Sequence, residues 1–209
     1  MEGLLGKKVG MTQIFTEDGT AVPVTVIVAG PCLVVQRKTA GREGYDAVQL
    51  GLVEERPPKH VNQPASGHFK AAGVQPLKRL NEFRVESEAA WKAGDEVKCS
   101  LFAVDDYVDV VATSKGKGFQ GVIRRHGHAG GKATHGSMFH RAPGSIGHSS
   151  DPSRVFPGTK MPGQTGGKRT TVKNLRVVKI DEKRNLLFLR GAVPGPKQGY
   201  VSIRRAKRG

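Results

Sequence analysis

Histidine is the residue type in this chain that most invites a chemical interpretation. Five of the seven histidines lie close together, and they are His126, His128, His135, His140 and His148. A zinc site would combine such side chains with Cys or carboxylate ligands on a scaffold that closes the coordination sphere. Neither cysteine lies in this segment, and the one nearby acid is Asp151. Because the surrounding positive charge would also repel a cation, the sequence predicts no metal site.

The same segment lacks the partners that catalysis requires. General acid–base and triad chemistry needs a carboxylate to orient a histidine, and residues 113–150 contain no Asp or Glu. Ser145, Ser149 and Ser150 do not stand in the sequence of a nucleophile elbow. We therefore expect no catalytic residue, no cofactor and no enzymatic activity.

A glycine pattern in the segment raises the possibility of a nucleotide site. Gly116, Gly118 and Gly121 spell G-x-G-x-x-G. A dinucleotide fingerprint requires the last glycine to open a helix and an acid about 20 residues later. Here VIRR soon gives way to HGHAGG, and Asp151 comes thirty residues after Gly121. GQTGGKR also departs from a Walker loop at two positions, so the sequence predicts no nucleotide site.

Positive charge concentrates in the middle of the chain, which carries +16 in total. Residues 113–169 contain ten Lys or Arg and one acid, whereas the other 152 residues contain 24 basic and 17 acidic residues. Such a concentration of positive charge is typical of a protein that binds a polyanion. Nucleic acid is the first candidate, because each neutralised phosphate releases condensed counterions. An anionic membrane is the weaker alternative, since no basic amphipathic helix is predicted. A purely solubilising role would not exclude acids from one window.

The central window has the composition of an RNA-binding extension. Its 13 glycines let the backbone approach phosphates closely, Lys and Arg pair with phosphates, and His and Phe rings stack on unpaired bases. It has few large apolar residues, so we expect it to become ordered on its partner. The residues predicted to bind RNA here are Lys115, Lys117, Phe119, Arg124, Arg125, His126, His128, Lys132, His135, His140, Arg141, Arg154, Lys160, Lys168 and Arg169.

The flanking segments must position this window, and they have the pattern of β-strands. In AVPVTVIVA, every second residue from Val22 to Val28 is valine, which is the period of a half-buried strand. EDGT and KIDEKRN are turn sequences between such runs. The other predicted strands are CLVVQRK, AVQLGLV, VKCSLF, YVDVVAT, TVKNLRVV, LLFLRGAV and YVSIRR. Many short strands separated by turns predict a mainly β fold with a closed or nearly closed barrel.

The remaining features complete the predicted organisation. Short helices are predicted at residues 66–72 and 87–92, within an irregular insertion at about residues 54–92. The predicted domains are a globular β domain of residues 1–112 and 170–209 and an extension of residues 113–169. Cys32 and Cys99 lie in apolar runs, which predicts buried, reduced thiols and a cytoplasmic protein. The first residues lack a signal peptide's apolar core, and no apolar run is long enough to span a bilayer.

Several longer motifs resemble one protein family. The segment FAVDDYVDVVATSKGKGFQGVIRR, from Phe102 to Arg125, is similar to the signature of the bacterial ribosomal protein L3 family. GLLGKKVGMTQIFTEDG, GHFKAAGV, HRAPGSIG and NLLFLRGAVPGP extend the resemblance over the whole chain. The chain is thereby identified as a member of that family, whose proteins are structural constituents of the large ribosomal subunit.

The resemblance implies both a fold and a set of partners. The implied fold is a six-stranded β barrel of the translation-protein type, with a long central extension that penetrates 23S rRNA toward the peptidyl transferase centre. The resemblance also implies early assembly near the 3′ end of 23S rRNA and contacts with ribosomal proteins L14 and L19. The matching extension segments are Lys115–Arg125, His135–Gly147 and Lys160–Gly163. Candidate RNA contacts of the globular domain are Lys7, Lys8, Arg204 and Arg205.

The sequence departs from the family pattern at a few positions. His126 and Gly127 stand where many members have Trp-Asn, and Pro162 stands where Ala is usual. Ser150 occupies the position of a glutamine that some members methylate, so this modification is not expected. The alternative function is a free-standing RNA chaperone or RNA-binding module outside the ribosome. Sedimentation with the large subunit would distinguish the two.

Overall fold

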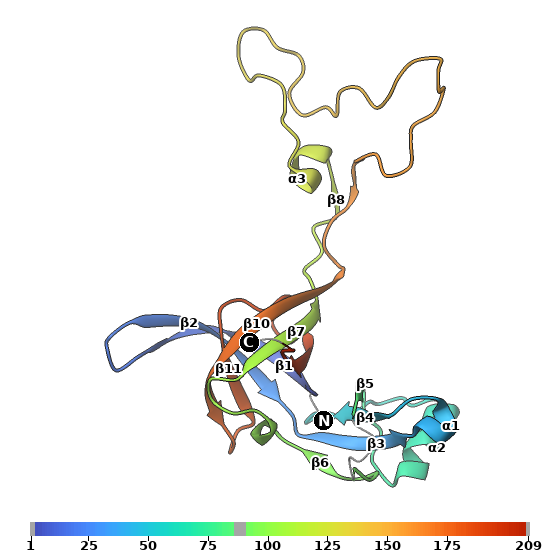
Figure 1. Cartoon of the computed structure of the whole chain (residues 1–209), viewed down its shortest axis with the longest axis vertical. Coiled ribbons are helices and arrows are strands. Elements are labelled where there is room, and N and C mark those ends of the chain that lie inside the picture. The colour runs from blue at the N-terminus through green and yellow to red at the C-terminus, as the bar shows by residue number, and fades with distance from the viewer. Residues whose placement is uncertain (1–2, 86–90, 208–209) are drawn as a thin grey trace. The chain divides into compact units, whose positions relative to one another are not determined.

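The computed structural model describes residues 3–85 and 91–207, and Figure 1 shows the order of their helices and strands. The chain divides into two compact units. One comprises residues 1–113 and 169–209, and we call it the globular unit; the other comprises residues 114–168, and we call it the extension. Each unit is described below by itself.

Six strands of the globular unit pair in a closed barrel in the order β1, β12, β7, β10, β11, β2. Every neighbouring pair is antiparallel, including β1 with β2, which closes the ring. The strands are β1 (Gly3–Phe15), β2 (Ala21–Ala29), β7 (Tyr107–Thr113), β10 (Arg169–Asp181), β11 (Leu186–Arg190) and β12 (Tyr200–Arg205). The prediction of a mainly β chain is confirmed.

Period-two alternation explains how these strands build a core. On β7, Val108, Val110 and Ala112 are buried while their neighbours are more exposed. The same alternation buries Leu187 and Leu189 on β11. Because successive side chains of a strand point to opposite faces, each strand gives one apolar face to the barrel interior. Each fully buried aliphatic side chain of this kind contributes about 1.5–3 kcal/mol to folding.

A second, four-stranded sheet belongs to the same globular unit and has the order β5, β4, β3, β6. Its strands are β3 (Cys32–Lys38), β4 (Ala47–Leu52), β5 (Leu80–Arg84) and β6 (Glu96–Val97), and two helices, α1 (Ala40–Glu43) and α2 (Gln63–Ala72), lie between them in sequence. One apolar cluster continues from the barrel into this sheet. The helix predicted at residues 66–72 is present as α2, which begins three residues earlier with a proline in its first turn.

Two predictions for this unit are wrong in detail. The strand predicted for VKCSLF ends at Val97, and a 3-10 turn, η1 (Cys99–Leu101), follows it. Cys99 and Phe102 are both buried around this turn. In a continuing strand the side chains of these two residues, three positions apart, would point to opposite faces of the sheet. The insertion expected to be irregular at about residues 54–92 contains β5, which pairs with β4. The helix predicted at residues 87–92 falls mostly on residues outside the described ranges.

The cysteine prediction holds, because Cys32 and Cys99 are both buried and free. Burial raises the pKa of the Cys32 thiol to about 12, so this side chain stays protonated and behaves as a small apolar residue. In the described residues there is no helix whose length and apolar character would let it cross a membrane.

The extension contains only short regular elements. They are β8 (Phe119–Gln120), α3 (Val122–His126) and β9 (Gly163–Gln164). β8 pairs with β9 in an antiparallel two-stranded sheet, with Phe119 opposite Gln164. The extension is one residue shorter at each end than the sequence predicted. The reason is that Thr113 ends β7, Arg169 begins β10, and the two residues pair within the barrel.

Candidate nucleic-acid interface

The first and last residues of the extension form a paired stalk, which we define as residues 114–121 and 163–168. The Ser114 N–H donates to Lys168 O at 2.9 Å, and the Lys117 N–H donates to Thr165 O at 2.8 Å. Gly166 has a φ of +70°, and a Cβ at this position would overlap the carbonyl oxygen of Lys115. Glycine is therefore needed where the two legs approach each other. The stalk therefore has backbone hydrogen bonds of its own, whereas the amino-acid composition of this window predicted order only on a partner.

Arg125 and His126 connect α3 to the returning leg of the extension. Arg125 Nη1 donates to the carbonyl oxygen of Met161 at 2.6 Å, and His126 Nε2 lies 3.0 Å from the same oxygen. Gly163 leaves room for the guanidinium, because a Cβ there would lie 2.7 Å from Arg125 Nη1. The sequence predicted both side chains as RNA ligands. In the structure their hydrogen bonds are to the protein itself.

The distal part of the extension, residues 127–162, contains no helix or strand. One backbone contact closes a loop in it, since the Gly131 N–H donates to His140 O at 3.0 Å. The loop carries three of the predicted RNA ligands, Lys132, His135 and His140, and all three are exposed. His128 is half-buried, and its ring centroid lies 5.9 Å from that of His126.

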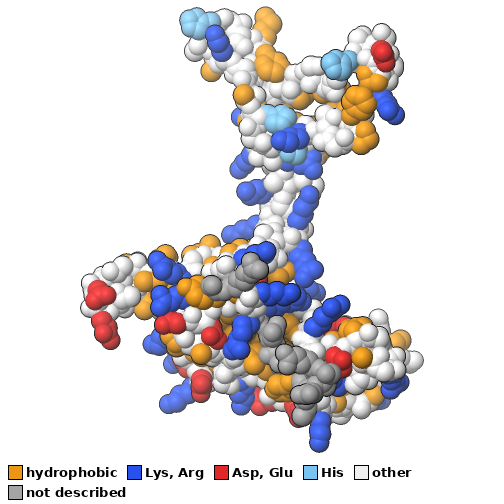
Figure 2. Space-filling view, viewed as in Figure 1, with side chains coloured by type: hydrophobic (Ala, Val, Ile, Leu, Met, Phe, Trp, Pro, Cys, Tyr) orange, Lys and Arg blue, Asp and Glu red, His pale blue; other side chains and the backbone are white. Residues whose placement is uncertain are grey.

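The other predicted cations of the extension lie on its surface, and Figure 2 shows basic side chains along this unit with few acidic ones among them. Arg154 lies over the ring of Phe156 at 5.5 Å. Phe119 is 74% exposed and Met138 is 98% exposed, so large apolar side chains face solvent here. Met138 is a surface feature that the sequence analysis missed. The exposed cations are Lys115, Lys117, Arg124, Arg141, Arg154, Lys160 and Lys168.

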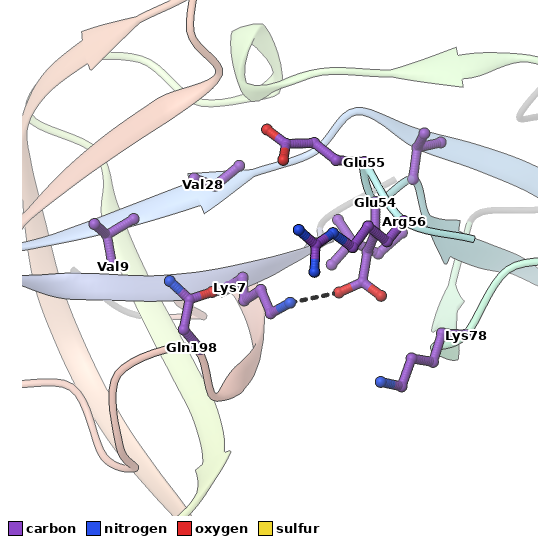
Figure 3. A pocket seen from close by; sticks show the side chains of 10 residues that line it. Lys7, Val9, Val28, Glu54, Glu55, Arg56, Lys78 and Gln198 are labelled. Atoms are coloured by element: carbon purple, nitrogen blue, oxygen red, sulfur yellow. Dashed lines mark hydrogen bonds and ion pairs between the residues drawn. The ribbon is translucent and has the colours of Figure 1, made fainter. Parts of the chain in front are cut away.

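Lys7, in the globular unit, lies at a pocket of about 480 Å³ between β1 and the segment that follows β4 (Figure 3). Its Nζ is 2.7 Å from Glu54 Oε1, and the Tyr200 hydroxyl donates to the same carboxylate at 3.0 Å. Burial raises the pKa of Glu54, but hydrogen bonds from Lys7 and Tyr200 outweigh it and hold the pKa below its usual value. The hydrogen bond to Glu54 raises the pKa of Lys7. Lys7 is therefore a cation that already has an acidic partner.

The sequence analysis placed Lys8 on the RNA-binding surface, and the structure contradicts this. The residue is only 8% exposed. Its Nζ donates to Val193 O at 2.6 Å and to Gly195 O at 3.3 Å. A register shift follows Lys8 in its pairing with β2. Because this ammonium is enclosed by protein carbonyls, it cannot reach a phosphate, and Lys8 has a structural role.

The three arginines at the strand ends are exposed, but two of them have protein contacts. Arg205 Nη2 lies 3.2 Å from Asp106 Oδ2, and the Arg204 guanidinium lies 5.6 Å from the ring centroid of Phe83. Arg169 is exposed at the first position of β10. Surface ion pairs contribute only about 0–1 kcal/mol, so a phosphate can compete for such arginines.

The geometry also bears on two other interpretations of the sequence, a metal site and a dinucleotide site. In the described ranges, no three His, Cys, Asp or Glu side chains gather as a metal site requires. Gly121 does precede a helix, contrary to the expectation for the glycine pattern, but α3 has only five residues. The strand before it pairs antiparallel in a two-stranded sheet, which is not the βαβ setting of a dinucleotide site.

Comparison with known proteins connects this geometry to one family. The sequence profile described as "Ribosomal protein L3" matches residues 85–186, which include the entire extension. "Large ribosomal subunit protein uL3" of Solibacter usitatus is 56% identical over 207 residues, which are 99% of each chain. This chain belongs to the ribosomal protein L3 family.

Other relatives extend the match over the full length of the chain. The uL3 protein of Pelotomaculum thermopropionicum is 55% identical over 98% of this chain and 97% of its own. That of Carboxydothermus hydrogenoformans is 53% identical over 100% of this chain and 99% of its own. All three are named as ribosomal proteins and none as an enzyme, so the family resemblance and the expectation of a non-enzymatic protein are confirmed.

Proposed function

We propose that this chain is a structural constituent of the large ribosomal subunit in the bacterial cytoplasm and that it binds 23S rRNA. The observation that carries the proposal is the extension. It presents nine Lys or Arg and one acid within residues 114–168, and most of these cations are exposed. Neutralising phosphates along a folded RNA is the favourable use of such a surface.

The two parts of the extension have different roles in this proposal. The stalk, with its paired legs, holds the cations of both legs in a narrow element that can enter a gap between RNA helices. The exposed loops then contact phosphates with Lys and Arg and stack rings on unpaired bases. The barrel, which we take to be of the translation-protein type, fixes both ends of the extension. The protein positions RNA and performs no chemistry itself.

The finer parts of the proposal come from the family. We propose that the chain binds early in assembly near the 3′ end of 23S rRNA and stabilises rRNA beside the peptidyl transferase centre. Neighbouring proteins such as L14 and L19 are its proposed protein partners. We retain all the predicted RNA ligands except Lys8, whose ammonium is enclosed. Arg125 and His126 are retained chiefly for the shape that they give the extension.

Reconstitution tests this proposal at two levels. Tagged full-length chain should sediment with the large subunit and resist low-salt washing, whereas a free-standing RNA chaperone would stay in the soluble fraction. The full-length relatives, all named as large-subunit proteins, do not favour that alternative. Large subunits should next be assembled with a chain that lacks the distal extension and assayed for peptidyl transfer. We expect a loss of activity, and wild-type rates in fully assembled particles would refute a role at that centre.

A further inference from the structure

The hairpin formed by β1 and β2 differs from the rest of the chain in charge. From Val9 to Gln36 there is no Lys or Arg, although the chain contains 34 of them. The charged residues of this stretch are Glu17 and Asp18, which lie in the turn and are exposed. A surface of this kind repels phosphates, so RNA is not the partner for which it is suited.

The end of this hairpin projects beyond the barrel, as Figure 1 shows for β1 and β2. The two strands pair with each other as far as Phe15 and Ala21. On the outer sides, β12 pairs with β1 only up to Lys7, and β11 pairs with β2 only from Val24 onward. In the described part of the chain, Met11–Phe15 therefore has no second strand beside it. An open strand edge of this kind is a template for association unless something covers it.

One face of the projecting hairpin also presents large apolar side chains, on either side of Gln13. Met11 and Phe15 are 53% and 64% exposed. The register runs without a shift from Gly10 to Phe15, so alternate residues, among them these two, share a face. Figure 2 shows acidic side chains at the end of the hairpin. Large apolar side chains next to acids, on a protein that is otherwise basic, are characteristic of a protein interface rather than of an RNA contact.

We propose that the hairpin end, residues 10–23, docks a second protein of the same particle, whose contact face presents Lys or Arg around an apolar patch. Charge complementarity selects this partner, because Glu17 and Asp18 attract cations and repel RNA. The apolar face supplies the area to be buried, and the open edge of Met11–Phe15 can pair with a strand of the partner. This inference rests on the proposed function, since it places the partner in the large subunit.

Site-specific crosslinking in the intact particle tests the inference. Benzoyl-phenylalanine replaces Phe15 in the full-length tagged chain, and large subunits that contain it are purified and irradiated. A matched control carries the same residue at Val104, which is 55% exposed on another part of the globular unit. Sedimentation is read first, because a chain that never enters the subunit would overturn the proposed function. For chain that does enter it, we expect a crosslink from position 15 to a Lys- or Arg-rich peptide of another protein.

The other outcomes decide against the proposal. A crosslink from position 15 to rRNA, or a yield no higher than at position 104, would overturn it.

Charge is tested separately with Glu17→Lys, for which Glu182→Lys is the control, because both glutamates are exposed in hairpin turns. We expect Glu17→Lys to lower the crosslinking yield at least about fivefold and Glu182→Lys to leave it unchanged. Equal yields from the two variants would remove the charge argument and, with it, the choice of partner.

Discussion

At the scale of single residues, the cations of this chain differ in what they already contact. Lys8 binds two backbone carbonyls, Lys7 pairs with Glu54, and Arg125 binds Met161 O. Lys8 is closed to phosphate by its contacts, whereas at Lys7 and Arg125 a phosphate must compete with the protein partner. By contrast, cations such as Lys132 and Arg141 lie on exposed loops. The Lys and Arg side chains of this surface therefore differ in how readily they can bind a phosphate.

The bond from Arg125 to Met161 O should hold the stalk closed in the free protein. We expect Arg125→Met to weaken the pairing of the legs by about 1 kcal/mol, the usual net contribution of such a hydrogen bond. Amide exchange at Lys117 and Thr165 should then be roughly fivefold faster. Hydrogen exchange with mass spectrometry measures this, and Arg124→Met, at an exposed neighbour, serves as the control. Equal exchange in both variants would show that Arg125 does not hold the legs together.

Glu54 should make the globular unit sensitive to acid. Its pKa is lowered from 4.5, so the stability that it contributes is present above the unfolded pKa and is lost as the pH falls through the folded value. We expect Glu54→Gln to lower the free energy of unfolding at neutral pH by about 1–2 kcal/mol. The difference from wild type should shrink as the pH falls below 4.5 and through the lowered pKa of Glu54. Urea unfolding at a series of pH values measures it, and a pH-independent difference would contradict the ion-pair explanation.

At the scale of elements, the structure shows where the extension can be shortened. The stalk ends in the pairing of Gln120 with Gly163, and Asn-Gly is a preferred two-residue hairpin turn. Replacing residues 121–162 with Asn-Gly should leave β8 paired with β9. Because loop-closure entropy changes slowly with length, we expect the Tm of the globular unit to stay within about 4 °C of wild type. Loss of cooperative unfolding in calorimetry would show that the barrel needs the distal extension.

At the scale of the whole molecule, charge should dominate the affinity for RNA. If six of the nine basic residues of the extension neutralise phosphates, they contribute about −4 to −5 to the slope of log K against log salt. Filter binding of full-length and shortened chains to the same 23S rRNA fragment measures the difference. Deletion of residues 121–162 removes six of those nine residues, so the slope of the shortened chain should be smaller by most of that amount. Equal slopes would mean that the contacts are made by the globular unit and by the three basic residues of the extension that the shortened chain keeps.

The sequence by itself determined the class of this protein, because the signals involved are local or compositional. Alternating valines such as those of AVPVTVIVA specify strands, since the side-chain period of a strand is two residues. Residues 113–169, with ten basic residues and one acid, indicate a polyanionic partner whatever the fold of this window. Long motifs such as the one from Phe102 to Arg125 specified the family.

Only the tertiary structure decided which cations are available, because that depends on residues far apart in sequence. Lys8 is enclosed by carbonyls 185 and 187 residues away, and Arg125 meets Met161 only because the two legs of the extension pair. The open edge of Met11–Phe15 exists because β12 stops pairing with β1 at Lys7. No local pattern contains these facts, since desolvation and pairing are set by the neighbours that the fold brings together.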